Sequence, residues 1–281
     1  MGVHPAAEGR FRHRGAELVY DDAGHGPLAV YAHGGFASQA QEDRMGLFGW
    51  APVLDAGRRL VRYDARAHGR STGRPIAADY TYTSLADDLL ALLDHLGAAE
   101  PAVGIGASMG CGTVLHAAVR APDRFSRLVL LIPPTAWATR AAYARANTAA
   151  ADAVEQQGAE AFRAAEGRGV RPAVVADVPD LPPTPDERVL PAVLRGLALS
   201  DLPAPAEIAG LRHPALILAW AGDRGHPLAT ADALAACLPD AQLRVARTRG
   251  DIRTWGEHIA EFLRPRRSPA ADEEGDPVPP N

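Results

Sequence analysis

One stretch decides the fold: Val103-Gly104-Ile105-Gly106-Ala107-Ser108-Met109-Gly110-Cys111-Gly112. It begins as a short apolar run, breaks at glycines around Ser108 and continues as a helical pattern over residues 113–119. A strand that passes directly into a helix holds the serine on a sharp turn, so Gly106 and Gly110 must be small to let the two elements approach. The pattern therefore predicts a strand, a tight turn that carries Ser108, and a helix that begins at Met109.

Such a turn favours a nucleophilic role for Ser108. Its hydroxyl would project from the carboxyl edge of the sheet, and the N–H of Met109 would point to where an oxyanion forms. A second glycine-rich loop, His33-Gly34-Gly35-Phe36, follows a predicted strand at residues 28–31 and can turn its N–H groups inward. Gly35 and Phe36 are therefore candidate oxyanion or binding residues. Without Ser108, the same loop would be interpreted as a turn with a solvent-facing histidine.

Composition narrows the classes of function. The chain has 281 residues, of which 47% are hydrophobic, enough for one large core with an inserted subdomain. A net charge of −5 with both signs scattered argues against a nucleic-acid-binding stripe and against a basic membrane-binding patch. All 29 basic residues are arginine, which excludes Schiff-base chemistry on lysine and a P-loop lysine.

The cysteines and the N-terminus bear on compartment and cofactors. Cys111 and Cys237 are too few for a disulfide framework or a cysteine metal site, so we expect neither a metal nor another cofactor. Residues 1–14 lack the apolar run of a signal peptide, and no later stretch approaches the length of a membrane span. We therefore expect a soluble, cytoplasmic protein that acts on a small molecule. Its oligomeric state is not indicated.

Strand-like and helix-like patterns alternate along the chain, which predicts a mainly parallel sheet. Residues 17–20 and 28–31 flank a turn rich in Gly and Asp, and we expect them to pair as an antiparallel hairpin. The later elements are predicted as strand 59–63, helix 83–97, the strand and helix around Ser108, strand 126–132, strand 214–220, helix 228–238, strand 242–246 and helix 251–263.

A long insertion separates the strands at 126–132 and 214–220. It combines alanine-rich helical stretches with a proline-rich passage, and we interpret it as a lid that closes over the serine and forms most of the substrate pocket. Its few charged clusters favour an apolar or aromatic substrate. We divide the chain into a core of residues 1–134 and 210–264, a helical lid of residues 135–209, and a polar tail of residues 265–281 that we expect to be disordered.

The motifs form an ordered set: His33-Gly34-Gly35, Tyr63-Asp64-x-Arg66-x-His68-Gly69-x-Ser71, the turn at Ser108, and Gly222-Asp223. Over residues 17–263, the chain resembles the α/β-hydrolase superfamily. The resemblance implies a mainly parallel sheet of about eight strands flanked by helices, with a serine nucleophile, an acid after a late strand and a histidine after the last strand. By position, Ser108 and Asp223 match the first two roles, and the N–H groups of Met109 and Phe36 match the oxyanion donors.

The histidine does not match. After its last strand the family has a Gly-His loop, whereas this chain has Arg249-Gly250-Asp251. An ionised carboxylate is a poor substitute for an imidazole, because the general base needs a pKa near the working pH. His226 lies in the loop after Asp223, on the same edge of the sheet as Ser108, and is the provisional base. The alternative interpretation of His226 is structural, as part of a His-Pro pair that caps the start of the next helix. His258 lies roughly 10 Å along the last helix and is the weaker candidate.

Two further residues have catalytic side chains but a structural interpretation. Asp64 and His68 lie in the loop after the strand at residues 59–63. We expect Asp64 to pair with nearby arginines and His68 to satisfy backbone groups of the loop.

Three hypotheses for the function stay open. The first is a serine hydrolase of a small, apolar ester, thioester or lactone, which forms an acyl-enzyme on Ser108 with His226 as base and Asp223 as orienting acid. The second is a ligand-binding protein that has kept the fold without hydrolysis, because Asp251 stands at the histidine position. The third is a lyase or cyclase that uses the oxyanion hole without an acyl intermediate.

Overall fold

A computed structural model of the chain describes residues 5–166 and 172–264. The strands are β1 (Ala6–His13), β2 (Ala16–Ala23), β3 (Leu28–Ala32), β4 (Arg59–Tyr63), β5 (Ala102–Ala107), β6 (Phe125–Leu131), β7 (Ala215–Trp220) and β8 (Ala241–Ala246). The α-helices are α1 (Gln39–Met45), α2 (Ala51–Asp55), α3 (Tyr82–His95), α4 (Met109–Arg120), α5 (Arg140–Gln157), α6 (Ala159–Glu166), α7 (Leu190–Ala198), α8 (Pro205–Ala209), α9 (Leu228–Cys237), α10 (Arg249–Arg253) and α11 (Trp255–Phe262). The predicted tail at 265–281 lies outside the described residues.

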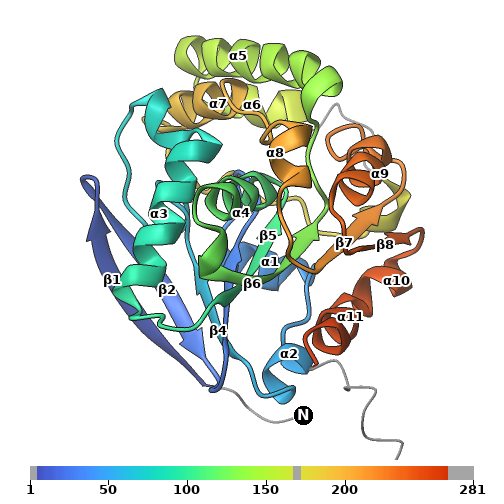
Figure 1. Cartoon of the computed structure of the whole chain (residues 1–281). Helices are drawn as coiled ribbons and strands as arrows, with labels where there is room; N and C mark the ends of the chain where they lie inside the picture. Colours follow the sequence, from blue (N-terminus) through green and yellow to red (C-terminus); the bar gives the residue numbers. More distant parts are fainter. Residues whose placement is uncertain (1–4, 167–171, 265–281) are drawn as a thin grey trace, which may run out of the picture.

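Within these residues, eight strands form one sheet in the order β1-β2-β4-β3-β5-β6-β7-β8. The six strands β4, β3, β5, β6, β7 and β8 are parallel to one another, whereas β2 is antiparallel both to β1 and to β4. Figure 1 shows this sheet with helices packed around it. The prediction of a mainly parallel α/β sheet flanked by helices is confirmed.

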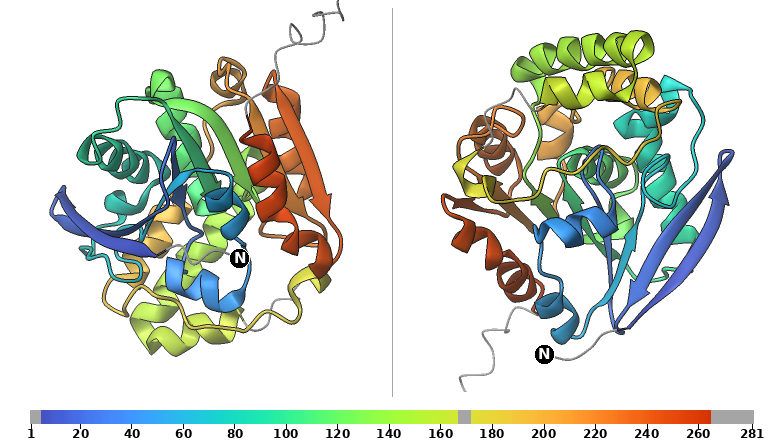
Figure 2. Two further views of the ribbon diagram at one scale, coloured as in Figure 1. Left: turned by 90° about the horizontal axis from the view of Figure 1, so that it is seen from below. Right: turned by 180° about the vertical axis from the view of Figure 1, so that it is seen from behind.

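Side chains alternate along the central strands between two apolar cores. On β6, Leu128 and Leu130 belong to the core that α3, α4 and α9 cover, whereas Val129 and Leu131 belong to the core that α2 and α11 cover. All four are completely buried. Figure 2 shows helices on both sides of the sheet. A parallel sheet covered on both faces needs such continuous apolar strands, and this explains the run at residues 126–132.

The predicted hairpin between residues 17–20 and 28–31 is wrong. β2 pairs with β1 on one side and with β4 on the other, and β3 lies between β4 and β5. The sequence pattern misses β1 because most of its side chains are exposed and only Phe11 is buried. The predicted last helix is also divided, since α10 and α11 meet at Thr254.

The insertion between β6 and β7 forms the cap, which we define as residues 135–209. Its helices α5, α6 and α7 lie together at the top of Figure 1. They enclose a small apolar cluster of their own, which consists of Ala151, Val154, Phe162, Leu190 and Leu194 and against which Phe36 of the core packs. The apolar cluster of the cap therefore packs against the loop that follows β3.

Arg140 fastens the cap to the core. Its buried guanidinium donates hydrogen bonds to the carbonyl groups of Leu197 (2.5 Å), in the last turn of α7, and of Ser200 (2.6 Å), just beyond it. The same group lies over the ring of Tyr82 at the start of α3, 5.1 Å from the ring centroid. The hydroxyl of Ser200 accepts a hydrogen bond from the Tyr82 N–H at 3.0 Å. These contacts hold α7 against α3.

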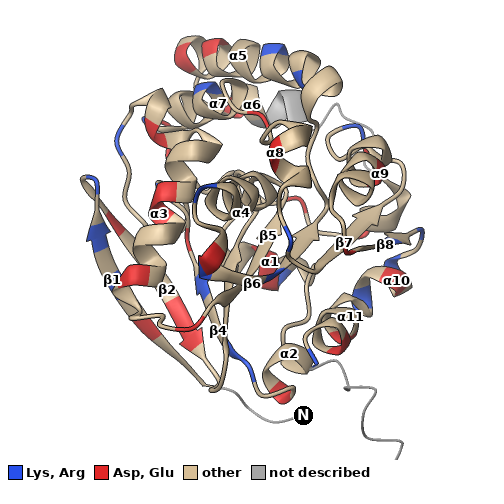
Figure 3. Cartoon of the chain, in the orientation of Figure 1, with Lys and Arg blue, Asp and Glu red and all other residues tan. Residues whose placement is uncertain are grey.

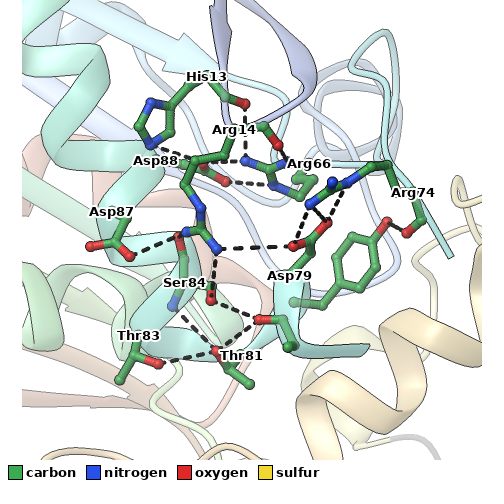
Figure 4. Close-up of polar contacts among 12 residues, drawn as sticks. His13, Arg14, Arg66, Arg74, Asp79, Thr81, Thr83, Ser84, Asp87 and Asp88 are labelled. Carbon is green, nitrogen blue, oxygen red and sulfur yellow. Dashed lines mark hydrogen bonds and ion pairs between the residues drawn. The ribbon is translucent and has the colours of Figure 1, made fainter. Parts of the chain in front are cut away.

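A buried ion pair fixes the loop after β4. The side chains of Arg66 and Asp88 are both 0% exposed, and Arg66 Nη2 lies 2.6 Å from Asp88 Oδ1. Arg66 also donates to the carbonyl groups of His13 and Arg14 at the turn between β1 and β2 (Figure 4). Because each charge is paired and hydrogen-bonded, the pair can be buried, and removing one partner would leave the other uncompensated.

Charged residues of both signs are interspersed over the outer elements (Figure 3). Among the helices of residues 5–166 and 172–264, none is long and apolar enough to cross a membrane. In the same part of the chain, no group of three or more His, Cys, Asp or Glu side chains is arranged to hold a metal ion.

Candidate active site

Ser108 forms the turn between β5 and α4 alone. β5 ends at Ala107 and α4 begins at Met109, and the serine has φ 49° and ψ −110°, a conformation that is strained for any residue with a side chain. A Cβ built on Gly106 would lie 2.2 Å from the carbonyl oxygen of Gly110, which leaves no room for one. A Cβ on Gly110 would lie 2.0 Å from the carbonyl oxygen of Ala32. Both positions therefore require glycine, because the backbone of a neighbouring element occupies the place of the side chain.

The structure brings an imidazole to this serine. His226 Nε2 lies 2.7 Å from Ser108 Oγ, and His226 Nδ1 lies 2.8 Å from Asp223 Oδ2. Both His226 and Asp223 belong to the loop between β7 and α9. With Nδ1–H donating to the carboxylate, Nε2 is free to accept the proton of the serine, as in a Ser-His-Asp triad.

Asp223 is held by hydrogen bonds beyond that from His226. The indole Nε1–H of Trp220 and the backbone N–H of Gly225 each donate to it at 2.8 Å. Burial raises the pKa of Asp223, but the hydrogen bond and charge of His226 and the other two donors outweigh burial and leave the pKa below its ordinary value. Asp223 is therefore ionised at neutral pH. Trp220 is not predicted from the sequence, where its only signal is an aromatic residue at the end of a buried strand.

Two backbone N–H groups beside the serine, those of Gly35 and Met109, make no hydrogen bond within the described part of the chain. The two residues adjoin, since a Cβ built on Gly35 would lie 3.8 Å from Met109 Cβ. The N–H of Phe36 is already used, because it donates to His68 Nε2 at 3.2 Å. This hydrogen bond contradicts the predicted donor role of the Phe36 N–H. Gly35 and Met109 are the pair with free donors.

His68 and Asp64 have the structural roles predicted for them. His68 is completely buried, and its Nδ1–H donates to the carbonyl of Arg66 at 2.8 Å while Nε2 accepts from Phe36. Burial lowers the pKa of His68 to about 3, so the ring is neutral. Asp64 accepts a hydrogen bond from the guanidinium of Arg70 at 3.0 Å. Both side chains support the loop after β4.

The segment after β8 does not reach the serine. Thr248 Oγ1 accepts the N–H of Asp251 at 3.2 Å, and Asp251 Oδ2 accepts the N–H groups of Arg247 (2.8 Å) and Thr248 (2.9 Å). These contacts form a capping box at the start of α10. His258 lies in α11, where its Nδ1 is 2.9 Å from Arg244 Nη1. Of the two candidate histidines, the structure brings only His226 to Ser108.

Residues 27–151 match the family model described as alpha/beta hydrolase fold. The crystal structure of the enol-lactonase from Burkholderia xenovorans LB400 aligns with a TM-score of 0.65 over 91% of this chain and 99% of that chain, at 25% sequence identity. The chain has the fold of the α/β-hydrolase superfamily. The resemblance inferred from the ordered motifs is thereby confirmed.

Curated relatives of this α/β hydrolase are enzymes. An sn-1-specific diacylglycerol lipase of Mus musculus is 36% identical over 129 residues, which make up 46% of this chain and 40% of the lipase. RutD of Caulobacter vibrioides, to which carbamate hydrolysis is provisionally assigned, is 27% identical over 234 residues, 76% of this chain and 84% of RutD. The match thus spans less than half of the lipase but most of RutD. Both relatives are named as enzymes that hydrolyse their substrates, and the bonds that they cleave differ.

A cavity of about 280 Å³ opens beside Gly35 in this α/β hydrolase. Its apolar wall comes from Phe36, from Met45 of α1 and from Phe162 and Leu181 of the cap, and polar groups of Gln41 and Asp180 also line it. The rings of Phe36 and Phe162 lie 5.0 Å apart. The cavity therefore lies between Gly35 and the cap.

Thr184 ties the proline-rich passage of the cap to the same loop. Its backbone N–H donates to the carbonyl of Phe36 at 2.9 Å, and its hydroxyl donates to the carbonyl of Ala37 at 2.7 Å. Gln41 Nε2 donates to the carbonyl of Pro182 at 2.7 Å. The cap and the loop after β3 are thus joined by hydrogen bonds as well as by the contact between Phe36 and Phe162.

Proposed function

We propose that this α/β hydrolase is a serine hydrolase that cleaves a small, apolar carboxylic ester, thioester or lactone through an acyl-enzyme on Ser108. The observation that carries the proposal is the relay of two short contacts, 2.7 Å from Ser108 Oγ to His226 Nε2 and 2.8 Å from His226 Nδ1 to Asp223 Oδ2. A serine hydroxyl becomes a nucleophile when a positioned base accepts its proton, and this relay supplies such a base.

In the acylation step, Ser108 Oγ attacks the acyl carbon while His226 Nε2 accepts the hydroxyl proton. Asp223 holds the ring by its Nδ1–H and stabilises the imidazolium that forms. The negative charge that develops on the carbonyl oxygen lies between the N–H groups of Gly35 and Met109. The imidazolium then donates its proton to the leaving oxygen or sulfur atom, and the acyl group stays on Ser108.

In the deacylation step, His226 removes a proton from a water molecule as that water attacks the acyl carbon. A second tetrahedral intermediate forms between the same N–H groups and collapses to a carboxylic acid. The proton returns from His226 to Ser108 Oγ, which restores the free enzyme. For a lactone, the leaving alcohol stays part of the product, which is then a hydroxy acid.

The size of the cavity supports a small acyl group, and the apolar side chains on one part of its wall support an apolar one. A space of about 280 Å³ beside Gly35, walled by Phe36, Met45 and Phe162, suits a short aliphatic or aromatic chain. The structural neighbour from Burkholderia xenovorans is an enol-lactonase, which supports lactones as one candidate class.

The alternative of a binding protein without hydrolysis rested on Asp251 at the histidine position. That reason no longer applies, because His226 brings an imidazole to the serine from another loop. No contact of the described residues favours a lyase or cyclase over a hydrolase.

The test is labelling of the full chain with a fluorophosphonate, together with turnover of p-nitrophenyl acetate, butyrate and octanoate, a thioester and a five-membered lactone. We expect stoichiometric labelling of Ser108 and faster turnover of the short esters than of the octanoate. Ser108→Ala should abolish both labelling and turnover. Unchanged turnover in Ser108→Ala would overturn the assignment of the nucleophile. An unlabelled wild type that binds an apolar ligand tightly would support the binding protein instead.

A further inference from the structure

Glu42 is a buried carboxyl group for which the reaction steps above have no use. It lies on α1 and is 3% exposed. Its Oε2 accepts the hydroxyl of Tyr31 at 2.7 Å, and its Oε1 accepts the backbone N–H of Gly34 at 3.2 Å. Burying a carboxyl group is costly unless its oxygens are hydrogen-bonded, so these two donors explain how it is tolerated.

Gly34 lies between this carboxyl group and the nucleophile. A Cβ built on Gly34 would lie 3.7 Å from Ser108 Cβ and 3.8 Å from Glu42 Oε1. The hydrogen bond from the Gly34 N–H to Glu42 therefore fixes the backbone at the point where it passes the serine.

The next peptide, between Gly34 and Gly35, carries the N–H that faces the oxyanion. Its carbonyl oxygen accepts the Nδ1–H of the completely buried His33 at 2.7 Å. In a trans peptide the N–H and the C=O point to opposite sides, so holding the carbonyl toward His33 directs the Gly35 N–H away from it. Glu42 and His33 together fix the peptides on both sides of the Gly34 Cα.

Glu42 is itself held firmly. At the start of α1, Ser38 Oγ accepts the Gln41 N–H at 3.3 Å, and the Gln39 N–H donates to Asp64 Oδ1 at 3.0 Å. Tyr31, the other partner of Glu42, is completely buried, and its ring centroid lies 4.5 Å from that of Trp50. The carboxyl group thus has a fixed helix on one side and a packed ring on the other.

We propose that Glu42 is a positioning residue for the oxyanion hole. Its carboxyl oxygen anchors the backbone at Gly34 and so aims the Gly35 N–H at the oxyanion that forms on the substrate bound to Ser108. This inference rests on the proposed serine-hydrolase function. An error of about 1 Å in the position of a catalytic group costs up to about 100-fold in rate, so the anchor acts on kcat.

The role depends on the acceptor oxygen and not on the charge. Burial raises the pKa of Glu42 to about 7, although the hydrogen bonds from Tyr31 and Gly34 and the positive charge of Arg62 oppose the shift. Both the neutral and the ionised carboxyl group can accept the Gly34 N–H. A glutamine at this position keeps an acceptor oxygen of the same reach without the charge, and an alanine removes it.

The experiment compares Glu42→Ala, Glu42→Gln and the control Asp43→Asn in the full chain. Asp43 is the next residue of α1, but its side chain is 47% exposed and pairs with Arg62 at the surface. We measure kcat and KM for p-nitrophenyl acetate, and the affinity for phenylboronic acid, whose adduct with a serine carries the charge of the tetrahedral intermediate.

We expect Glu42→Ala to lower kcat by about 10- to 100-fold with KM changed less than about twofold, and to weaken phenylboronic acid binding in parallel. Glu42→Gln should keep kcat within about threefold of wild type, and Asp43→Asn should match wild type. An unchanged kcat in Glu42→Ala overturns the inference. So does a loss in Glu42→Gln as large as that in Glu42→Ala, because the charge would then be what matters.

If Glu42→Ala fails to fold, Tyr31→Phe replaces it, because it removes one hydrogen bond from the carboxyl group and keeps the ring. A fall in kcat of about threefold or more without a change in KM supports the inference, and an unchanged kcat overturns it. Failure of the wild type to react with the fluorophosphonate and with every ester overturns the proposed function and this inference together. An active wild type with an active Glu42→Ala overturns this inference alone.

Discussion

Two loops at the carboxyl edge of the sheet carry polar residues, and they use them differently. The loop after β7 carries Asp223 and His226, and both side chains lie in the hydrogen-bonded relay to Ser108. The segment after β8 carries Asp251, whose carboxylate accepts backbone N–H groups at the start of α10. The family resemblance implies the histidine in the second segment. The position of a histidine along the chain therefore does not identify the base. What identifies the candidate is the loop that brings an imidazole nitrogen to the serine, and here that loop follows β7.

His226→Ala is the change that would break this comparison most directly. Without the imidazole, Ser108 has no base, and we expect kcat for p-nitrophenyl acetate to fall by about 10⁴-fold or more. The matched control is His258→Ala, which removes the histidine that lies beyond β8 and should leave kcat within twofold. If the two variants exchanged these outcomes, the base would belong to the segment after β8.

Asp223→Asn tests the acid of the same loop. The amide keeps the shape of the side chain, but it cannot hold the His226 ring in the orientation that leaves Nε2 free to accept a proton. We expect kcat to fall by about 10⁴-fold, with KM less affected. Steady-state kinetics at neutral pH measure the loss. An Asp223→Asn variant that kept more than a tenth of the wild-type kcat would show that His226 needs no partner.

The pH dependence of stability sharpens the comparison further. The hydrogen bond and charge of His226 hold the pKa of Asp223 below its ordinary value despite burial. Such a group stabilises the folded chain above its unfolded pKa of about 4, and this contribution is lost as the pH falls through the lower folded pKa. Urea unfolding should therefore show wild type more stable than Asp223→Asn at pH 7, with a gap that shrinks below pH 4. A gap that widened on acidification would contradict the assignment.

Thr248→Ala gives the smallest expected effect and acts on the other segment. It removes the side chain that accepts the Asp251 N–H at the start of α10. We expect a loss of about 1 kcal/mol in the free energy of unfolding and a kcat within twofold of wild type. Chemical denaturation and p-nitrophenyl acetate turnover measure the two quantities. A fall in kcat beyond tenfold in the folded variant would mean that this segment supports the reaction after all.

The features that depend on local sterics could be predicted from the sequence. The turn at Ser108 follows from Gly106 and Gly110, because each glycine is required by a contact within that strand–turn–helix unit or with the adjacent strand β3. The spacing of Asp223 and His226 made His226 only a provisional base, since spacing alone does not tell which way a loop turns. In the structure, the Gly225 N–H donates to Asp223 and the His226 ring lies against Ser108.

The features that depend on distant contacts could not be predicted. The N–H of Phe36 is occupied by His68, which lies 32 positions further along the chain. Glu42 occurs in the polar segment of residues 39–45, which suggests a solvent-exposed helix, yet it is buried against Tyr31. β1 escaped detection because an edge strand with one buried side chain has no apolar alternation.

Trp220 gives the molecule an optical property. Its indole meets the His226 ring edge-on, with centroids 6.0 Å apart, and stacks on Trp255 of α11 at 6.1 Å. Protonated imidazoles quench the fluorescence of adjacent indoles, so the emission of this tryptophan follows the charge on His226. The tetrahedral intermediates, in which His226 carries the proton of Ser108 or of the attacking water, would therefore lower this emission, whereas the acyl-enzyme, in which the ring is neutral again, would not.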